Sequence, residues 1–306
     1  MRFPRNRNHS CFRRKYAAKQ FELGVHYYNL RTGDHGVNLQ RSIECFTEAL
    51  RFYTAEAAPD KYAATHANLG TAYAELPTGD RAADLGRAIG CFTEALRFRT
   101  AEAAPLEYAA TQNDLGIAYG RLPTGNRAEN LDRAIRCFTK ALRFRTPEVA
   151  PLDYAATQNN LGHAYVRLPT GDRAGNLGRA IGCFTEALRF RTAEAAPLAY
   201  AATQDNLGLA YAELPTGDRA ENLGRAIGCF TEALRFRTAE ATQLEYARTQ
   251  NNLGNAYWEL PTGDRAANLD WAIGCFTEAL RFRTAEAVPL EYAATQNNLG
   301  LAYAEC

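Results

Sequence analysis

The sequence predicts an all-α protein in which antiparallel helix pairs stack into a solenoid. Three observations predict it: a 46-residue repeat, apolar residues at helical spacing within each repeat, and turn signals between the helices. A Leu-Gly-x-x-Tyr motif recurs at this interval from Leu23 to Leu299, which gives six complete units and a seventh start. Six of the eight cysteines recur with the same step: Cys45, Cys91, Cys137, Cys183, Cys229 and Cys275. The two domains that 306 residues would suggest on length alone are therefore replaced by one array.

Each repeat contains two predicted helices, as residues 152–197 illustrate. The stripe of the first helix consists of Tyr154, Thr157, Leu161, Ala164, Tyr165 and Leu168. A Pro-Thr-Gly-Asp turn beginning at Pro169 ends this helix. The stripe of the second helix consists of Leu177, Ile181, Phe184 and Leu188. Either Asp172 or Asn176 caps the second helix.

The repeats need one another to form a core. A single helix pair has too few apolar residues to bury its stripe, so neighbouring pairs must stack. We divide the chain into a basic arm, residues 1–13, and the array, residues 14–306. The arm contains no acid and no apolar segment of the kind found in secretory signals. It could touch nucleic acid or an anionic surface; we expect a disordered start that grades into the first helix.

Composition and motifs exclude several function classes. The formal charge is only +1, which disfavours nucleic-acid binding by the whole molecule, and no apolar run is long enough to span a membrane. Phosphate-loop, zinc-protease and serine-hydrolase motifs do not occur, and the five histidines do not recur in register. We therefore expect no enzymatic activity and no cofactor.

The cysteine ladder predicts packing rather than cross-linking. Successive copies are separated by a whole helix pair, and even adjacent helices lie about 8–10 Å apart, whereas a disulfide needs Cα atoms within about 7 Å. No cysteine or histidine spacing suits a tetrahedral metal site. Reduced thiols favour a cytoplasmic location.

Two motifs of the repeat resemble the tetratricopeptide repeat (TPR) over residues 14–306. The first helix carries Leu-Gly-x-x-Tyr, and the second carries Ala-x-x-x-Phe-x-x-Ala, as in Ala180-Phe184-Ala187. The resemblance implies a right-handed superhelix with a concave groove that holds peptides. The family unit of 34 residues is lengthened here by six residues in each loop, which leaves the superhelical pitch open. Gln or His replaces the family's tryptophan on the first helix, and Ser42 replaces one alanine.

The repeat also looks like long-repeat arrays that precede CHAT domains in bacterial multidomain proteins. No such effector domain is present in this sequence.

Differences between the copies concentrate on one face of the first helix. Between residues 152–197 and 198–243 this helix changes past its N-terminus at positions spaced i, i+4, i+7 and i+8, opposite the buried stripe. We call this the variable face. It is either drift on an exposed surface or selection for a ligand, and the resemblance places it in the concave groove. The candidate groove residues are Asn113, Asn159, Asp205, Asn251, Asn297, Ile117, His163, Leu209, Asn255, Arg121, Arg167, Glu213, Trp258 and Glu259.

Five of these residues form a polar column: Asn113, Asn159, Asp205, Asn251 and Asn297. An amide offers both a donor and an acceptor, so the column could pair with the backbone of an extended peptide. Kinesin light chain and similar TPR proteins use a comparable column, which is what the resemblance implies here. The alternative is a solvated row that links neighbouring helices.

Charge and bulk make two further predictions about the groove. Arg121 and Arg167 are flanked by Glu75, Glu213 and Glu259, so we expect an acidic ligand segment at the arginines and basic residues toward the C-terminal repeats. Trp258 occupies a position where other repeats have small residues, which predicts a ligand anchor.

The last helix is predicted to expose an apolar stripe that includes Leu299, Leu301 and Tyr303. Solenoid ends normally carry polar substitutions. We therefore expect self-association through this edge, or fraying of the last helix.

The sequence thus favours a non-catalytic protein–protein interaction scaffold that binds a peptide or partner helix. The alternative is a sensor or regulatory arm of a larger signalling or CHAT-protease protein.

Overall fold

The structure is a computed structural model that describes residues 6–77 and 79–306, with side chains from residue 12 onward. In this part of the chain all regular secondary structure is α-helical, and two compact units, residues 1–149 and 150–306, are described separately. The first unit contains α1 (Asn6–Asn29), α2 (His35–Leu50), α3 (Pro59–Glu75), α4 (Arg81–Ala95), α5 (Pro105–Arg121) and α6 (Arg127–Leu142). The second contains α7 (Pro151–Arg167), α8 (Arg173–Leu188), α9 (Pro197–Ala212), α10 (Arg219–Leu234), α11 (Gln243–Glu259), α12 (Arg265–Leu280) and α13 (Pro289–Ala304).

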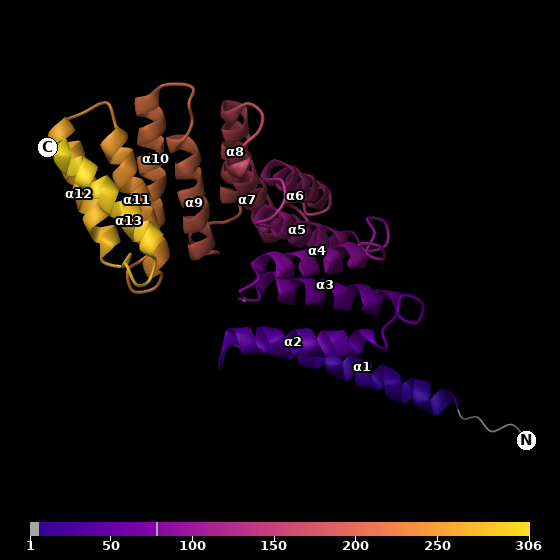
Figure 1. The fold of residues 1–306 in the computed structure, drawn as a ribbon. Helices are drawn as coiled ribbons and strands as arrows, with labels where there is room; N and C mark the ends of the chain where they lie inside the picture. The colour runs from indigo at the N-terminus through magenta and orange to yellow at the C-terminus, as the bar shows by residue number, and fades with distance from the viewer. Residues whose placement is uncertain (1–5, 78) are drawn as a thin grey trace, which may run out of the picture. The chain divides into compact units, whose positions relative to one another are not determined.

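Within each unit the helices stack in chain order (Figure 1). Inside a unit each helix packs against the next one of that unit, and the first helices of its adjacent repeats also touch, as α3 touches α5 and α9 touches α11. The predicted α-solenoid of antiparallel helix pairs is therefore confirmed in each unit.

A glycine–phenylalanine contact holds the two helices of a repeat together. A Cβ atom added to Gly208 on α9 would lie 2.6 Å from the ring of Phe230 on α10. Two non-bonded carbon atoms do not approach each other this closely. The same contact joins Gly24 to Phe46, Gly70 to Phe92, Gly116 to Phe138, Gly162 to Phe184 and Gly254 to Phe276. The glycine of the Leu-Gly-x-x-Tyr motif therefore lets the helices approach around a buried ring.

Both predicted capping residues bond within the turn between the two helices: Asp172 caps the helix, and Asn176 closes the turn. Asp172 caps α8 by accepting hydrogen bonds from the backbone N–H groups of Ala174 and Gly175, at 3.1 and 2.9 Å. Asn176 donates from Nδ2 to the carbonyl oxygen of Thr170 at 2.8 Å and so closes the turn. Gly171 has φ of +81°, a conformation that glycine adopts without strain.

The N-terminal boundary differs from the prediction. Helix α1 begins at Asn6, so residues 6–13 belong to a helix and are not the disordered arm that the charge pattern predicted. The remainder of the arm, residues 1–5 with Arg2 and Arg5, lies outside the described residues. Basic charge alone did not reveal that the helical segment starts before the repeat motif.

Candidate ligand-binding surface

The polar column lies on the first helices of five repeats, but most of its side chains are not open to solvent. Asn113, Asp205 and Asn251 are buried, and Asn159 is half-buried. Asn297 on α13 is exposed. An amide row that pairs with a ligand backbone would have to be accessible, so that prediction is corrected for the buried members.

In the second unit the column joins successive repeats. The residue after each column position donates from its amide to the column residue of the preceding repeat. These bonds run from Asn206 to Asn159 at 3.2 Å, from Asn252 to Asp205 at 3.3 Å and from Asn298 to Asn251 at 3.5 Å. The linking alternative fits the structure, although much of the row is buried rather than solvated.

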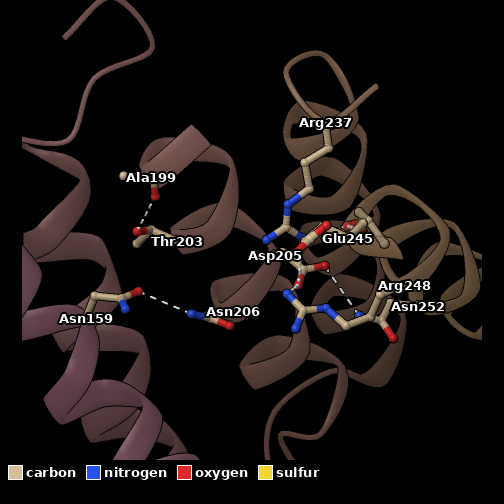
Figure 2. Close-up of polar contacts among 10 residues, drawn as sticks. Asn159, Ala199, Thr203, Asp205, Asn206, Arg237, Glu245, Arg248 and Asn252 are labelled. Carbon is tan, nitrogen blue, oxygen red and sulfur yellow. Dashed lines mark hydrogen bonds and ion pairs between the residues drawn. The ribbon is translucent and has the colours of Figure 1, made fainter. Parts of the chain in front are cut away.

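Asp205 is the centre of a polar cluster in the second unit (Figure 2). Its carboxylate is fully buried and lies 3.0 Å from the guanidinium of Arg237 and 2.9 Å from that of Arg248. Arg237 is also buried, whereas the Arg248 side chain is 47% exposed. A buried carboxylate without such partners would cost several kcal/mol, on the order of 3–5. The two arginines therefore make the aspartate tolerable at this position.

Asp205 and Arg248 both differ from the residues found at their positions in other repeats, and they pair with each other. Asp205 stands where four other repeats have asparagine, and Arg248 stands where all the others have alanine. The corresponding alanines are Ala18, Ala64, Ala110, Ala156, Ala202 and Ala294. Because the exceptions occur in successive repeats and pair with each other, they fasten α9 to α11.

An arginine in the loop before α5, α9, α11 and α13 makes a second link within each unit; it is buried before α11 and α13 and half-buried before α5 and α9. Arg237 donates to the hydroxyl oxygen of Thr249 at 2.7 Å. Equivalent bonds join Arg99 to Thr111 at 3.0 Å, Arg191 to Thr203 at 3.0 Å and Arg283 to Thr295 at 2.8 Å. Burial lowers the pKa of Arg99, Arg191 and Arg283 from the usual value. These guanidinium groups hold the loops to the following helices.

Two pockets open on the variable face in the first unit, and they are copies of each other. The first pocket is lined by Val25, Tyr28, Asn29, Phe46, Asn68 and Thr71. The second pocket is lined by Thr71, Ala74, Glu75, Phe92, Asp114, Ile117 and Arg121. Adding 46 to each position of the first pocket gives a residue of the second. Their volumes are about 220 and 120 Å³.

The polar rim of these pockets is partly organised before any ligand arrives. The hydroxyl of Tyr28 donates to Glu75 Oε1 at 2.8 Å. Burial, followed by this bond to the carboxylate, raises the pKa of Tyr28. Burial also raises the pKa of Asp114, which accepts a hydrogen bond from Asn113 Nδ2 at 3.2 Å. The second pocket therefore combines a carboxyl in a weakly polar site with the apolar ring of Phe92.

The charged positions of the variable face do not all present free charge. Glu213 forms an ion pair with Arg173, and Glu259 forms one with Arg219. Both glutamates are therefore already paired with an arginine, and the prediction that they attract a basic ligand segment stays a prediction. Arg121 has no ion-pair partner among the described residues.

Trp258 belongs in part to the core. It is half-buried and packs against a cluster formed by Leu269, Ala272, Phe276 and Ala302. Its indole nitrogen is buried and has no hydrogen-bond partner among the described residues. Trp258 is therefore in part a core residue, contrary to the prediction, and its role as a ligand anchor stays a prediction.

The remaining predicted positions have different environments. His163 and Arg167 are exposed on α7, and Ile117 lines the second pocket. Leu209 packs against the core of the second unit. Asn255 accepts a hydrogen bond from Asn298 at 3.0 Å. In this unit the variable face therefore contributes to packing between repeats as well as to the surface.

The thiols are free and mostly shielded. Cys137 and Cys275 are buried, and Cys91, Cys183 and Cys229 are half-buried. Burial raises the pKa of each of these five to about 11. Among the described residues no group of His, Cys, Asp and Glu side chains could hold a metal ion. None of the described helices combines the length and the apolar character of a membrane span.

Sequence reasoning missed Arg248, Tyr28 and Asp114. Each is an exception within its set of repeat positions: Arg248 among alanines, Tyr28 among mostly small residues, and Asp114 among residues that are asparagine in every repeat but the first. A comparison of all seven copies at every position, rather than of two adjacent copies, would have found them.

The fold and these contacts define a helical repeat protein. No protein-family model matches the chain, and no curated protein is significantly similar to it. The solved structures that match include the crystal structure of BtubC (BKLC) from P. vanneervenii, with a TM-score of 0.56 and 21% sequence identity. The match covers 83% of this chain and 91% of that chain. At this identity the similarity supports the fold alone.

Proposed function

We propose that the chain is a TPR-like interaction scaffold that binds an extended peptide segment of a protein partner on the variable face of its first helices. The observation that carries the proposal is the pair of repeat-related pockets in the first unit. A surface that has the same pocket in consecutive repeats suits an extended peptide, because a peptide presents side chains at regular intervals.

The size and lining of the pockets favour side chains over a small molecule. Pockets for drug-sized ligands usually have volumes of about 300–1,000 Å³, whereas these have about 220 and 120 Å³. A phenylalanine ring lines each one, Phe46 in the first and Phe92 in the second, and polar groups surround it. An apolar side chain could cover the ring while its backbone bonds to the rim.

The proposal includes no catalysis. No histidine or cysteine lines either pocket, and Glu75 is bonded to Tyr28. We also propose a cytoplasmic location, because the buried thiols are packing residues in the reduced state.

Thr71 provides the test, because it lines both pockets. Peptides that bind the purified chain would be selected from a random 12-residue library. Their affinities would then be measured by fluorescence anisotropy for the wild type, T71W and T93W. Thr93 is a matched control: it is an exposed helical threonine that, like Thr71, donates to the carbonyl oxygen four residues earlier.

We expect the selected peptides to bind T71W at least tenfold more weakly than the wild type and to bind T93W normally. Equal binding to all three proteins would overturn the proposal. Circular dichroism would show that both variants keep the helical fold.

A further inference from the structure

The two pockets of the first unit are lined by equivalent phenylalanine rings but by different polar side chains. The first pocket has a pair of amides, Asn29 and Asn68. At the equivalent positions, 46 residues later, the second pocket has a pair of carboxylates, Glu75 and Asp114. The repeat therefore places a neutral pair and an acidic pair in two adjacent pockets of the same design.

Asn68 and Asp114 line the pockets, whereas their equivalents in the second unit join two repeats. Those equivalents are asparagines that donate to the column residue of the preceding repeat, as Asn206 does at 3.2 Å. The column position of the preceding repeat is occupied by Phe21 for Asn68 and by Ala67 for Asp114. Neither of these apolar side chains has a hydrogen-bond acceptor. The amide and the carboxylate are therefore left to line the pockets.

The carboxylate of Asp114 forms no ion pair among the described residues. It accepts one hydrogen bond there, from Asn113 Nδ2 at 3.2 Å. Burial raises the pKa of Asp114 above its usual value, although the bond from Asn113 and the charges of Arg145 and Arg99 oppose this effect. Glu75 adds a second negative charge nearby. A cation beside such a carboxylate is attracted more strongly than in water, because the surroundings are less polar.

The second pocket carries a net negative charge, whereas the first pocket is neutral. Glu75 and Asp114 contribute two negative charges to the lining of the second pocket and Arg121 contributes one positive charge, which leaves a formal charge of −1. Arg121 is exposed, and among the described residues it pairs with neither carboxylate. The side chains that line the first pocket are all uncharged. The two pockets therefore differ in the charge of the side chain that complements them.

We infer that the second pocket binds a lysine or arginine side chain of the peptide, with its cation at the carboxylates of Glu75 and Asp114. The aliphatic stem of such a side chain covers the ring of Phe92, while its charged end stays with the polar groups. The first pocket, with Asn29 and Asn68, takes an uncharged side chain. The inference rests on the proposed function and names the side-chain chemistry that this surface selects.

The spacing of the pockets defines a probe peptide. First helices of adjacent repeats touch, packed helices lie about 8–10 Å apart, and an extended chain advances about 3.3 Å per residue. Side chains about three residues apart therefore reach adjacent pockets. The lysine probe is a fluorescein-labelled peptide with two copies of Phe-Ser-Ser-Lys-Ser-Ser. Its central phenylalanine has a lysine at this spacing on both sides, so either binding direction is possible. The norleucine probe replaces each lysine by norleucine, which is uncharged.

The double variant E75N/D114N gives the second pocket the amide pair of the first. We expect the wild type to bind the lysine probe at least tenfold more tightly than the norleucine probe in fluorescence anisotropy, and E75N/D114N to bind both probes equally. E56N/E102N is the matched control, because it removes two exposed carboxylates from the loops before α3 and α5. It makes the same change in net charge and should keep the lysine preference. Equal wild-type affinities for the two probes, or a lysine preference that a folded E75N/D114N retains, would overturn the inference.

A reciprocal variant keeps the inference testable even if E75N/D114N folds poorly. N29E/N68D gives the first pocket the carboxylate pair of the second. A labelled peptide with four copies of Lys-Ser-Ser, which presents a lysine to both pockets, should bind this variant at least tenfold more tightly than the wild type. An unchanged affinity would count against the inference.

The T71W variant separates this inference from the proposed function. If T71W binds neither probe while E75N/D114N keeps the lysine preference, the pockets bind peptides but the cation is wrongly assigned. If T71W binds both probes as the wild type does, the pocket function fails and the inference fails with it. A wild type that binds neither probe would overturn the inference, whereas the library peptides would still decide the proposed function.

Discussion

At the scale of single residues, glycines of the same helix pair have opposite roles. Gly208 faces the ring of Phe230, whereas a Cβ atom on Gly228 would meet nothing within 4 Å. We expect Gly208→Ala to lower the free energy of unfolding by about 1–3 kcal/mol, because the ring must move. Gly228→Ala should raise it by about 0.5–1 kcal/mol through helix propensity. Urea denaturation measures both, and equal effects would contradict the contact.

The Asp205 cluster predicts a non-additive pair of substitutions. Asp205→Ala should cost about 3 kcal/mol, because Arg237 stays buried without its carboxylate. D205N/R248A restores the residues found in most other repeats and should cost less than about 1 kcal/mol. Urea midpoints of the two variants and of R248A test this. A double variant as unstable as Asp205→Ala would show that the pair does not act as a unit.

The two tryptophans of the chain make a matched test of packing. Trp258 packs against the cluster around Phe276, whereas Trp271 is 62% exposed and stacks on Tyr257. Trp258→Ala should lower stability by about 2–3 kcal/mol. Trp271→Ala should change it by less than about 1 kcal/mol, since it loses mainly the stacking contact. Similar melting temperatures for the two variants would place Trp258 outside the core.

At the scale of helices, the sequence predicted correctly the features that depend on a single helix pair, namely the buried faces and the helix ends. The stripes of Leu161 and Phe184 fixed which faces are buried, and the turn residues located the helix ends. The side chains of Asn159 and Asp205 each accept a hydrogen bond from the next repeat. The pattern of apolar residues along a single helix contains no information about such a partner. Helical spacing therefore identified the variable face, but not how much of it is used between repeats.

The second helices carry a ladder of shielded thiols whose reactivity should depend on pH. For a pKa of about 11, as in Cys91 and Cys183, only about one thiol in a thousand is ionised at pH 8. Iodoacetamide should therefore label the exposed Cys306 first. Labelling of the ladder in the folded chain should increase about a hundredfold between pH 8 and pH 10. Mass spectrometry of the peptides measures the rates; uniform labelling at pH 8 would contradict the shielding.

The same thiols link stability to alkaline pH. Burial raises the folded-state pKa above the unfolded value of about 8.5. Their contribution to stability is therefore fully present below that pH and is lost as the pH rises toward 11. Urea midpoints should fall between pH 9 and 11, and less steeply after Cys183→Ala than in the wild type. A midpoint that is constant over this range would contradict the link.

At the scale of the whole chain, helix α13 differs from the other first helices in what covers it. A Cβ atom added to Gly300 would meet nothing within 4 Å, whereas the six equivalent glycines each face a phenylalanine. Leu301 and Tyr303 are 43% and 59% exposed. We expect the amides of α13 to exchange hydrogen faster than those of α9, and light scattering to show association at high concentration.

Leu301→Asn supplies the control for this edge, because Asn255 occupies the same position on α11. The variant should associate less and keep its helical content. A wild-type chain that stays monomeric, with α13 protected as well as α9, would refute the prediction.

The Asp205–Arg248 pair limits how the array can change length. Near-identical tandem copies in a gene gain or lose whole units by unequal recombination. The two residues are 43 positions apart in successive units. Deletion of residues 206–251 would leave Asp205 followed by a unit with Ala294 in place of Arg248. This deletion would leave the buried carboxylate of Asp205 with one arginine partner instead of two. Selection should therefore keep these two units adjacent, whereas units elsewhere are freer to be duplicated or lost.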